Sequence, residues 1–342
     1  MKIGIVTSNL RQGGVTVYTD NLITILEELG HSCILYTGIG NMLEREVKTF
    51  AILSEPSQFN YGEWSMFVRD LKSQCFDQII VQNSWAIILF KILYHSKEVT
   101  FMSHGWHWRG KSKVVRWFLI CFENILNLRR LKYIFISGSV MNDFKKNILF
   151  SKRHSAMLIQ NSVPKINAKA SQTKSIVVPM RADVAKDHKN AFNLAIVAED
   201  FDFVFCGEGV NKDYWFKYCK RNIPDNVVLL DMVTDMESIY DEALAILLLS
   251  HFESLPLVLI EAMSCGIPCI ASDVGSIRDV LVGCGFLVER NDDYRSIMLY
   301  LNQLRNDESF YKKQSVTSLK VFEENFSFER YKIQISEYLH RI

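Results

Sequence analysis

The chain has 342 residues, long enough for two domains of roughly 100–200 residues each, which excludes a small stapled module. Its 49% hydrophobic and 23% charged residues describe a globular protein and exclude a disordered one. Lys and Arg number 39 against 38 Asp and Glu, a net charge of +1, which excludes a polycation of the nucleic-acid-binding type. Any basic surface must therefore be local.

Short β-branched segments alternate with longer amphipathic segments, a pattern typical of parallel sheets with helices on both faces. In the first half this pattern predicts strands at 2–7, 33–37, 78–82, 99–103, 133–137 and 156–160. Helices are predicted between them at 14–29, 61–74, 85–95, 111–130 and 139–148. The first half is therefore expected to form one parallel α/β domain.

The second half repeats this architecture. A polar segment at 162–174, which contains a proline, predicts an interdomain linker. Further strands are predicted at 175–179, 201–206, 227–230, 245–249, 268–271 and 286–288, with helices between them. The sequence thus predicts two α/β domains of similar size.

Cysteine and apolar patterns bear on the compartment. The eight cysteines form no Cys-x2-Cys pair and no Cys/His cluster at zinc-finger spacing, so we expect free thiols in a reducing cytosol. No apolar run reaches the roughly 18–20 residues of a membrane-spanning helix. Met1-Lys2 leads directly into a predicted strand and lacks a signal-peptide core. We therefore expect a cytoplasmic protein.

Positive charge is concentrated in one segment, where residues 87–153 hold thirteen Lys and Arg against three acids. Aromatic and basic side chains interleave there in a basic aromatic region at 106–132: Trp106, Trp108, Trp117, Phe118 and Phe122 with Arg109, Lys111, Lys113, Arg116, Arg129, Arg130 and Lys132. This combination suits an anionic membrane surface, and the alternative is a solvated basic helix with a buried apolar face. No nucleic-acid-binding motif accompanies the charge, so no nucleic-acid partner is expected.

The most informative segment, 250–268, directly follows the predicted strand at 245–249. Pro256 predicts a helix start. In a parallel α/β sheet such a junction lies at the carboxyl edge, where helix N-terminal amides attract phosphate. Glu253 and Glu261 belong to this segment, and carboxylates accept hydrogen bonds from sugar and ribose hydroxyls. The pattern favours a nucleotide-sugar site over the alternative of two solvated acids.

A bound diphosphate also requires positive charge. Arg181 ends the first strand of the second domain, and Lys186 is expected to begin the next helix, so both are candidates to neutralise a pyrophosphate leaving group. Lys189 is a substitute for Lys186 in this role. The alternative is a loop charge pair with Asp183 and Asp187.

Two further candidates follow strands of the first domain. Gly13-Gly14 comes after strand 2–7 and predicts a loop whose backbone approaches the ligand closely. His104-Gly105 follows strand 99–103 at the carboxyl edge, so its imidazole is expected to face the same site, unless it is a structural histidine.

Together these motifs resemble glycosyltransferase family 4, also called glycosyl transferases group 1, the retaining nucleotide-sugar glycosyltransferases of the GT-B fold. The most specific part is the segment from Glu253 to Glu261 and its continuation to Pro268. Other matching segments are 13–14, 30–31, 104–105, 137, 160–163, 181–188, 205–209, 271–275 and 326–330. The resemblance implies two Rossmann-like α/β domains facing across a cleft, at 1–163 with a C-terminal helix at 328–342 crossing back, and at 172–327.

The resemblance also implies a role for each candidate. Glu261 would bind the ribose hydroxyls, Glu253 the hydroxyls of the transferred sugar, and Arg181 with Lys186 the diphosphate. The other implied donor contacts are Gly13, Gly14, His104, Gly207, Met232, Val233 and the backbone of Leu255, Pro256, Leu257 and Val258.

Three positions depart from the family pattern. Asp231 stands where a glycine is common, Met180 precedes Arg181 where a glycine is expected, and Ser162 replaces the glycine of an Asn-Gly-Val motif.

The implied reaction is retaining transfer of a sugar from a UDP- or GDP-sugar to a hydroxyl of a glycan or lipid-linked acceptor. We expect no metal cofactor, since the basic pair meets the diphosphate charge. The expected setting is bacterial surface polysaccharide biosynthesis, lipopolysaccharide or capsule, at the inner face of the plasma membrane. The alternative is a non-catalytic GT-B partner subunit that binds a glycan or a sister transferase.

Overall fold

The computed structural model describes residues 1–341 except Gln12, His95, His107, Arg109, Gly110, Val184 and Thr234. Arg109, a member of the predicted basic aromatic region, therefore lies outside the described residues. The contacts divide the chain into two compact units. Unit 1 holds Met1–Asn161 with the chain from Tyr331 onward, and unit 2 holds Ser162–Arg330.

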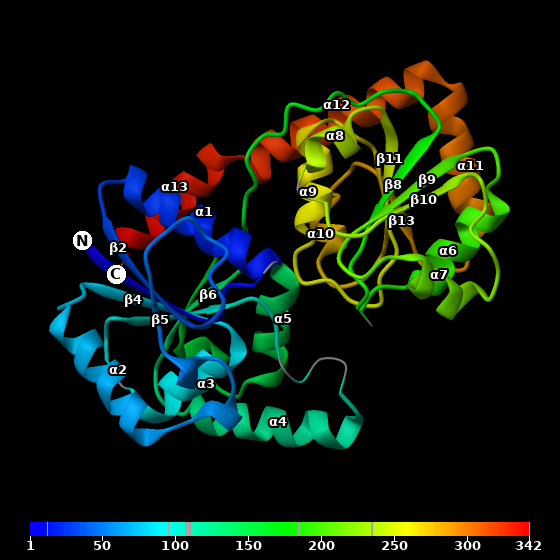
Figure 1. Ribbon diagram of the computed structural model, residues 1–342. Coiled ribbons are helices and arrows are strands. Elements are labelled where there is room, and N and C mark those ends of the chain that lie inside the picture. Colours follow the sequence, from blue (N-terminus) through cyan, green and yellow to red (C-terminus); the bar gives the residue numbers. More distant parts are fainter. Residues whose placement is uncertain are drawn as a thin grey trace. The chain divides into compact units, whose positions relative to one another are not determined.

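Unit 1 is built on a parallel sheet of seven strands in the order β3-β2-β1-β4-β5-β6-β7 (Figure 1). The strands are β1 (Lys2–Asn9), β2 (Ser32–Ile39), β3 (Val47–Thr49), β4 (Gln78–Gln82), β5 (Val99–Ser103), β6 (Lys132–Phe135) and β7 (Ser155–Leu158). The helices are α1 (Gly14–Glu28), α2 (Tyr61–Ser73), α3 (Ser84–Leu93), α4 (Lys113–Leu126), α5 (Gly138–Asn147) and α13 (Phe328–Leu339), with 3-10 turns at Ala51–Leu53, Pro56–Gln58 and Ser151–Arg153. The six predicted strands are present, and three-residue β3 is an addition at the sheet edge.

Helices cover both faces of this sheet. On one face, Phe67 of α2, Phe90 of α3 and Phe144 of α5 are buried in one apolar cluster with strand residues. On the other face α1 meets the C-terminal helix, where the rings of Tyr18 and Tyr331 lie 6.0 Å apart. The Tyr338 hydroxyl of α13 donates to Thr100 of β5 at 2.8 Å, so the C-terminal helix is part of unit 1.

Unit 2 has a six-stranded parallel sheet in the order β10-β9-β8-β11-β12-β13. Its strands are β8 (Ser175–Pro179), β9 (Asp202–Cys206), β10 (Val227–Leu230), β11 (Ala243–Leu248), β12 (Cys269–Ser272) and β13 (Phe286–Val288). Its helices are α6 (His188–Val197), α7 (Lys212–Cys219), α8 (Met236–Tyr240), α9 (Leu257–Ser264), α10 (Ile277–Val280), α11 (Tyr294–Asn306) and α12 (Glu308–Asn325). Two parallel sheets with flanking helices confirm the predicted α/β, Rossmann-like architecture.

The central strand β11 is buried on both faces. Leu247 packs in the cluster formed with α6, α7 and α11, whereas its neighbours Ile246 and Leu248 pack in the cluster formed with α8, α9, α10 and α12. Successive side chains point to opposite faces of a strand, and a strand covered on both faces reads as a continuous apolar run. This burial fixes the position of β11 in the sheet, and therefore the point at which the loop after β11 begins.

The segment 162–174 is not the free interdomain linker that its composition predicted. Val163 and Ala168 are buried in the core of unit 2. The backbone amide of Ile166 donates to Ser264 Oγ at 3.2 Å, and that of Lys169 donates to Asp241. A few small apolar residues among polar ones are enough to attach the segment 162–174 to unit 2. The composition of the segment does not show this burial.

A buried ion pair holds α4 against the sheet of unit 1. The Lys91 Nζ atom of α3 lies 2.6 Å from Glu123 Oε2 of α4, and both side chains are almost fully buried. Asn127 donates to the same carboxylate oxygen, and the ammonium lies 5.3 Å from the centroid of the Tyr133 ring. Burial alone would lower the pKa of Lys91, but the charges and hydrogen bonds of Tyr133 and Glu123 raise it.

Among the described residues, no helix combines the length and apolar character needed to cross a bilayer. All eight cysteines are free thiols.

Because each buried charge depends on its partner, Lys91→Met alone should lower the free energy of unfolding by about 3–5 kcal/mol, leaving the Glu123 carboxylate unpaired. The double substitution Lys91→Met with Glu123→Leu should recover most of this loss, since it removes both charges. Denaturant unfolding of both variants measures the difference. Equal losses in the single and double variants would contradict this account of the pair.

Candidate active site

The strand order of unit 2 reverses between β8 and β11, and ligands of open parallel sheets bind at such a point, outside the carboxyl ends of the strands. Arg181 and Lys186 lie in the loop after β8, and Glu253 in the loop after β11. The structure therefore brings these three predicted residues to one edge of one sheet.

Lys186 and Glu253 form an ion pair at this edge. The Lys186 Nζ atom lies 2.5 Å from Glu253 Oε1, and the side chains are 16% and 12% exposed. Lys186 precedes α6 and does not begin it, which corrects the sequence prediction, because Asp187 caps that helix by accepting from the Asn190 amide. An isolated antiparallel bridge joins Lys186 to Ser250 and sets the two loops side by side.

A hydrogen-bond network behind this pair was not predicted. Ser250 donates to Glu253 Oε1 at 2.8 Å, so this oxygen accepts from two donors. The Ser250 amide donates to Ser272 Oγ, which in turn donates to Asn291 Oδ1 at 2.6 Å. Asn291 Nδ2 donates to Asp187 at 2.9 Å. The network fixes the loops after β8, β11, β12 and β13 against one another.

The only sequence signal for this network is that its members follow strands of the same parallel sheet. The network stabilises the ionised form of Asp187. Burial alone would raise the pKa of Asp187, but hydrogen bonds from Asn190 and Asn291 bring this pKa below its ordinary value. These residues act through Lys186 and Glu253, so we class them as positioning residues.

Two glycines allow backbone loops to approach closely at this edge. A Cβ on Gly207 would lie 2.1 Å from the Met180 carbonyl oxygen, and a Cβ on Gly275 would lie 1.7 Å from the Glu253 carbonyl oxygen. Both have positive φ, 145° and 61°. Gly207 thus packs the turn after β9 against the residue before Arg181, and Gly275 packs the loop after β12 against Glu253.

The departure at Asp231 has a structural role. Its Oδ1 atom accepts from the Gly209 amide at 2.7 Å, and its carbonyl accepts from the Gly207 amide at 2.9 Å. Asp231 therefore secures the glycine turn after β9. Met180 is buried in the core of unit 2, so a side chain is accommodated at that position as well.

The N-terminus of α9 leaves its first amides without a side-chain cap. By contrast, side chains of Asp187, Asn211, Asp235, Asp293 and Asp307 cap the helices α6, α7, α8, α11 and α12. Pro256 occupies the cap position of α9, and the helix itself starts at Leu257. Uncapped N-terminal amides together with the helix dipole favour an anion, and they follow Glu253 by a few residues.

Glu261 lies in α9 and faces the end of α8. Its Oε2 atom accepts from the Tyr240 hydroxyl at 3.0 Å. Burial raises the pKa of Glu261, and the bond from Tyr240 lowers it only in part. Val233, the predicted base-site residue, is partly buried in the cluster that α9 shares with α8. Glu261 is therefore a half-buried carboxyl held in one orientation.

Arg181 remains largely in solvent. Its side chain is 53% exposed, and its guanidinium lies 3.7 Å from Asp183. The Arg181 carbonyl is hydrogen-bonded to Nε2 of buried His188 at 2.7 Å, which fixes the backbone of the loop. The guanidinium is left able to turn to a ligand. Burial lowers the pKa of His188.

The remaining candidates lie in unit 1, also at a carboxyl edge and at a reversal of strand order, between β1 and β4. Gly13 has φ of 151° and its carbonyl accepts from the Thr16 amide at 3.0 Å, which starts α1. Gly14 is the first residue of that helix. The His104 ring lies 4.8 Å from the Tyr18 ring of α1, edge to face.

The hydrogen bonds around His104 fix its tautomer. Thr19 Oγ1 donates to the Val15 carbonyl and so accepts from Gln82 Nε2 at 2.6 Å. Gln82 Oε1 then faces His104 Nε2 at 3.0 Å, so this ring nitrogen carries the hydrogen and Nδ1 is an acceptor. Burial lowers the pKa of His104 to about 4, so the ring is neutral at physiological pH.

Among the described residues, no group of three or more His, Cys, Asp or Glu side chains could hold a metal ion.

Comparisons with known proteins concern the family and the fold. The model of the family described as Glycosyl transferases group 1 matches residues 160–319, which cover most of unit 2. N-acetyl-alpha-D-glucosaminyl L-malate synthase of Bacillus anthracis is 29% identical over 148 residues, 42% of this chain and 39% of that protein. The O-antigen biosynthesis glycosyltransferase WbnH of Escherichia coli is 24% identical over 344 residues, 95% of this chain and 96% of its own.

A solved structure shows the same fold over the full length. HepE of Anabaena, in complex with UDP and glucose, covers 100% of both chains with a TM-score of 0.79 at 15% identity. The chain therefore has the GT-B fold over its full length, and its residues 160–319 match the family glycosyl transferases group 1.

Proposed function

We propose that the protein transfers a sugar from a nucleotide-diphosphate sugar to a hydroxyl of a glycan or lipid-linked acceptor, with retention of anomeric configuration. The observation that carries this proposal is the Lys186–Glu253 ion pair beside the uncapped N-terminus of α9. It joins a cation and amides that suit a diphosphate to a carboxylate that suits sugar hydroxyls.

The order of these groups along α9 supports a nucleotide-sugar donor. Glu253 precedes the helix, the uncapped amides begin it, and Glu261 lies one turn further on. A ligand with hydroxyls at both ends and phosphates between them matches this order. The HepE structure with UDP and glucose supports a UDP-sugar, and a GDP-sugar is the other candidate.

In the proposed reaction the bond between the anomeric carbon and the diphosphate oxygen breaks, and a bond to the acceptor oxygen forms. The acceptor proton passes to the leaving diphosphate. Arg181, Lys186 and the α9 amides stabilise the charge on that leaving group, which electrostatic catalysis requires. Glu253 is held as an acceptor by Lys186 and Ser250 through Oε1, and among the described residues its Oε2 atom has no protein partner.

The same groups support a reaction without a metal cofactor, because two cations and a helix N-terminus already meet the diphosphate charge. The relation to WbnH, an O-antigen biosynthesis enzyme, supports an acceptor from bacterial surface polysaccharide synthesis at the inner face of the plasma membrane. The rival function is a non-catalytic partner subunit, and the retained cations and carboxylates favour the enzyme.

The donor site can be tested without an acceptor. One nucleotide diphosphate or its sugar should raise the melting temperature, because a ligand at 100 times its Kd adds about 2.7 kcal/mol to stability. Arg181→Ala should reduce that shift, since it removes an exposed cation and disturbs no buried contact. Thermal unfolding with a panel of nucleotides and nucleotide-sugars measures both effects. A folded protein that no member of the panel stabilises would favour the non-catalytic subunit.

Lys186→Ala should lower kcat by about 100-fold or more, since charge stabilisation of the leaving group is lost. Lys189, the alternative that the sequence offered, is exposed in α6, and it is Lys186 that pairs with Glu253. Lys189→Ala is therefore the matched control and should retain wild-type turnover. Donor hydrolysis or transfer to an acceptor measures the rates, and denaturant unfolding confirms that both variants fold. Full turnover in the Lys186 variant would remove this residue from the mechanism.

The neutral state of His104 predicts a pH dependence. Its pKa is about 4 in the folded chain and 6.5 ordinarily, so the unfolded chain binds a proton that the folded chain does not. The free energy of unfolding should therefore fall as pH falls from 6.5 to 4, by up to about 1.4 kcal/mol per pH unit for this group. Denaturant unfolding of His104→Asn across this window should show a shallower slope. An unchanged slope would mean that His104 takes up its proton in the folded chain.

A further inference from the structure

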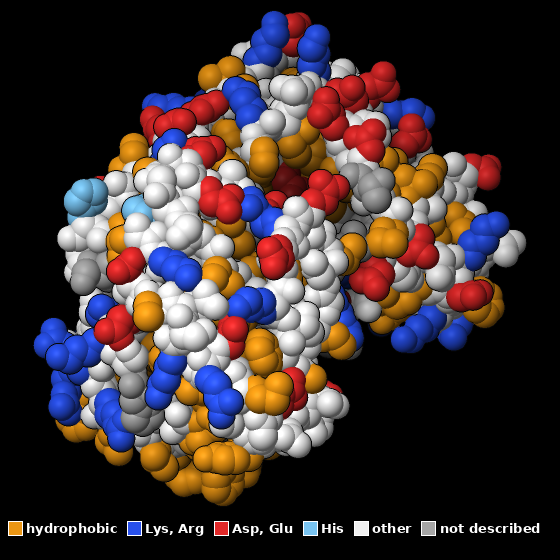
Figure 2. Space-filling model, turned by 60° about the vertical axis from the view of Figure 1, so that its left-hand side comes forward, with side chains coloured by type: hydrophobic (Ala, Val, Ile, Leu, Met, Phe, Trp, Pro, Cys, Tyr) orange, Lys and Arg blue, Asp and Glu red, His pale blue; other side chains and the backbone are white. Residues whose placement is uncertain are grey.

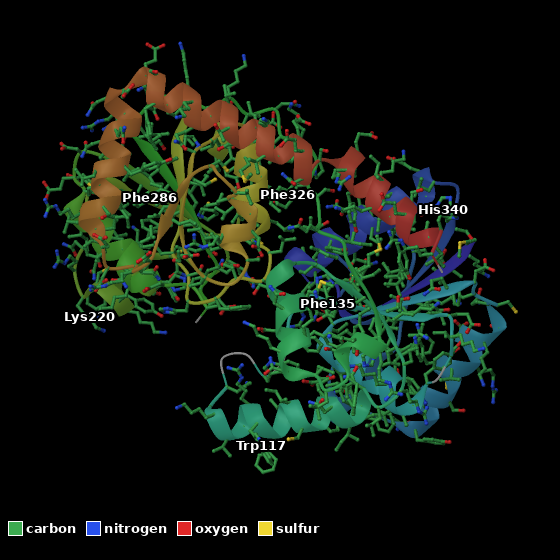
Figure 3. All side chains as sticks on the ribbon, turned by 180° about the vertical axis from the view of Figure 1, so that it is seen from behind. Trp117, Phe135, Lys220, Phe286, Phe326 and His340 are labelled. Carbon is green, nitrogen blue, oxygen red and sulfur yellow. The ribbon has the colours of Figure 1, made fainter. Side chains whose placement is uncertain are left out.

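The outward face of α4 is apolar, which is unusual for a surface helix. Trp117, Phe118 and Ile125 are 61%, 62% and 64% exposed, and Val114 and Leu128 are comparable. In a soluble protein the face of a helix away from the core is normally polar. Figure 3 shows Trp117 pointing away from unit 1 on the far side of α4. The spacing of Val114, Trp117, Phe118 and Ile125 places them along one side of the helix, over roughly 17 Å at 1.5 Å per residue. Leu128 follows just beyond the end of the helix.

The segment that carries this face is rich in cations and contains no exposed acid. The segment 111–132 holds Lys111, Lys113, Arg116, Arg129, Arg130 and Lys132. Its single acid, Glu123, is buried against Lys91 on the opposite side of the helix. Figure 2 shows hydrophobic side chains gathered at the lower edge of unit 1, where α4 lies, with Lys and Arg side chains beside them.

Two tryptophans of the predicted basic aromatic region do not belong to this surface. Trp106 is 8% exposed, Trp108 is fully buried, and their rings stack 4.4 Å apart within the core of unit 1. The sequence prediction is corrected accordingly: residues 111–132 carry the surface, and Trp106 and Trp108 belong to the core of unit 1.

A cationic cavity adjoins the C-terminal end of α4. It has a volume of about 790 Å³, and Leu126 of α4 contributes to its wall. Six cations line it, and one of them, Lys91, is paired with the buried Glu123. The other five are Lys97, Arg129, Arg130, Lys132 and Arg341. Within the described part of the chain, none of these five forms an ion pair with a carboxylate. Such a cavity suits an anionic group, and its position at the end of an exposed apolar helix indicates a group attached to a lipid.

This cavity is not the site of sugar transfer. It is lined by Val99, Lys132 and Ser155, the first residues of β5, β6 and β7. His104 follows the opposite end of β5, five residues beyond Val99 or roughly 17 Å away at 3.3 Å per residue. An anion bound in the cavity therefore lies at the other edge of the sheet from the candidate active-site residues of unit 1.

We propose that α4 and the cationic cavity together dock unit 1 on an anionic lipid bilayer, with the apolar face entering the interface and the cavity holding a phosphate headgroup. Apolar and aromatic groups flanked by Lys and Arg are the features that bind such surfaces. A second copy of the chain is a poorer partner, because a symmetric contact would bring the cations of both copies together. The inference deepens the membrane location in the proposed function.

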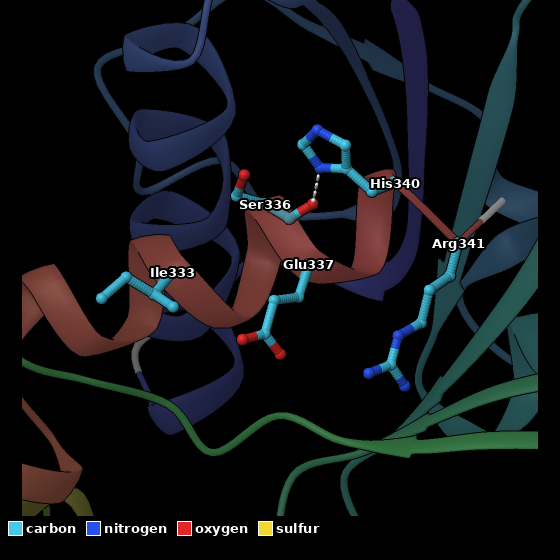
Figure 4. A pocket seen from close by; sticks show the side chains of 5 residues that line it. All are labelled: Ile333, Ser336, Glu337, His340 and Arg341. Atoms are coloured by element: carbon cyan, nitrogen blue, oxygen red, sulfur yellow. Dashed lines mark hydrogen bonds between the residues drawn. The ribbon is translucent and has the colours of Figure 1, made fainter.

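A second cavity of unit 1 offers no comparable site. It measures about 420 Å³ and lies along α13, lined by Ile333, Ser336, Glu337, His340 and Arg341 (Figure 4). His340 is turned back onto its own helix, where Nδ1 bonds the Ser336 carbonyl at 2.7 Å. The carboxylate of Glu337 makes this groove unsuited to an anion. Arg341 lines both this groove and the cationic cavity.

Cosedimentation of the full chain with vesicles tests the proposal. The protein should bind phosphatidylcholine vesicles that contain phosphatidylglycerol, bind pure phosphatidylcholine vesicles far less, and lose affinity as salt rises. Trp117→Ser with Phe118→Ser should weaken binding by about tenfold or more. Arg129→Gln with Arg130→Gln should weaken it by about fivefold for each charge.

Matched controls lie on α2 of the same unit, where Met66 is an exposed apolar residue and Lys72 an exposed cation. Met66→Ser and Lys72→Gln should bind vesicles like the unaltered chain. Glycerol phosphate in solution should compete only at high concentration, since it lacks the bilayer. Competition as strong as that of the vesicles would assign the cavity to a soluble anion and overturn the proposal.

Three other outcomes would also overturn it: no binding to anionic vesicles, equal loss in the control variants, or a dimer in solution that Trp117→Ser converts to a monomer. The vesicle assay contains no donor. The α4 variants should show the same thermal shift with nucleotides as the unaltered chain, so a failure of the membrane proposal and a failure of the donor proposal are distinguishable.

Discussion

The parallel pairing of β11 between β8 and β12 is the constraint on which the candidate active site depends. Because all strands of unit 2 run the same way, every strand ends at one edge, and the loops after β8, β11 and β12 must share that edge. Space there is so short that two positions admit only glycine: Gly207 against the Met180 carbonyl and Gly275 against the Glu253 carbonyl. The backbone thus places Lys186 and Glu253 close enough for their side chains to be in direct contact.

The ion pair of Lys186 and Glu253 resolves a conflict that the proposed chemistry creates. A diphosphate site needs a cation and a sugar site needs a carboxylate, and two mostly buried charges this close are stable only as a hydrogen-bonded pair. Ser250 and the network through Ser272 and Asn291 hold Glu253 independently of Lys186, so that in the proposed reaction the cation can turn to phosphate. In the proposed reaction, diphosphate and sugar are therefore sensed by one coupled pair rather than by two independent contacts.

The sequence predicted the strands, the two-domain architecture and the segment from Glu253 to Glu261, since each rests on local patterns of apolar residues, prolines and glycines. It did not reveal Asn291 or the bond from Asp231 to the Gly209 amide, because these join residues far apart in the chain. It misplaced the segment 162–174, since the burial of Val163 and Ala168 depends on a surface formed elsewhere in unit 2. Local patterns thus place residues at the sheet edge, whereas their mutual contacts require the fold.

The orientation of α4 follows from one buried acid. α4 has apolar residues on both sides, so hydrophobicity alone does not decide which side packs on the sheet. Glu123 decides it: the carboxylate finds Lys91, Asn127 and the surroundings of Tyr133 only when its side faces inward. Trp117, Phe118 and Ile125 are then forced outward. Exposing these aromatic side chains to water is unfavourable unless another apolar phase covers that face of the helix. This cost is the physical basis for proposing that a bilayer lies there.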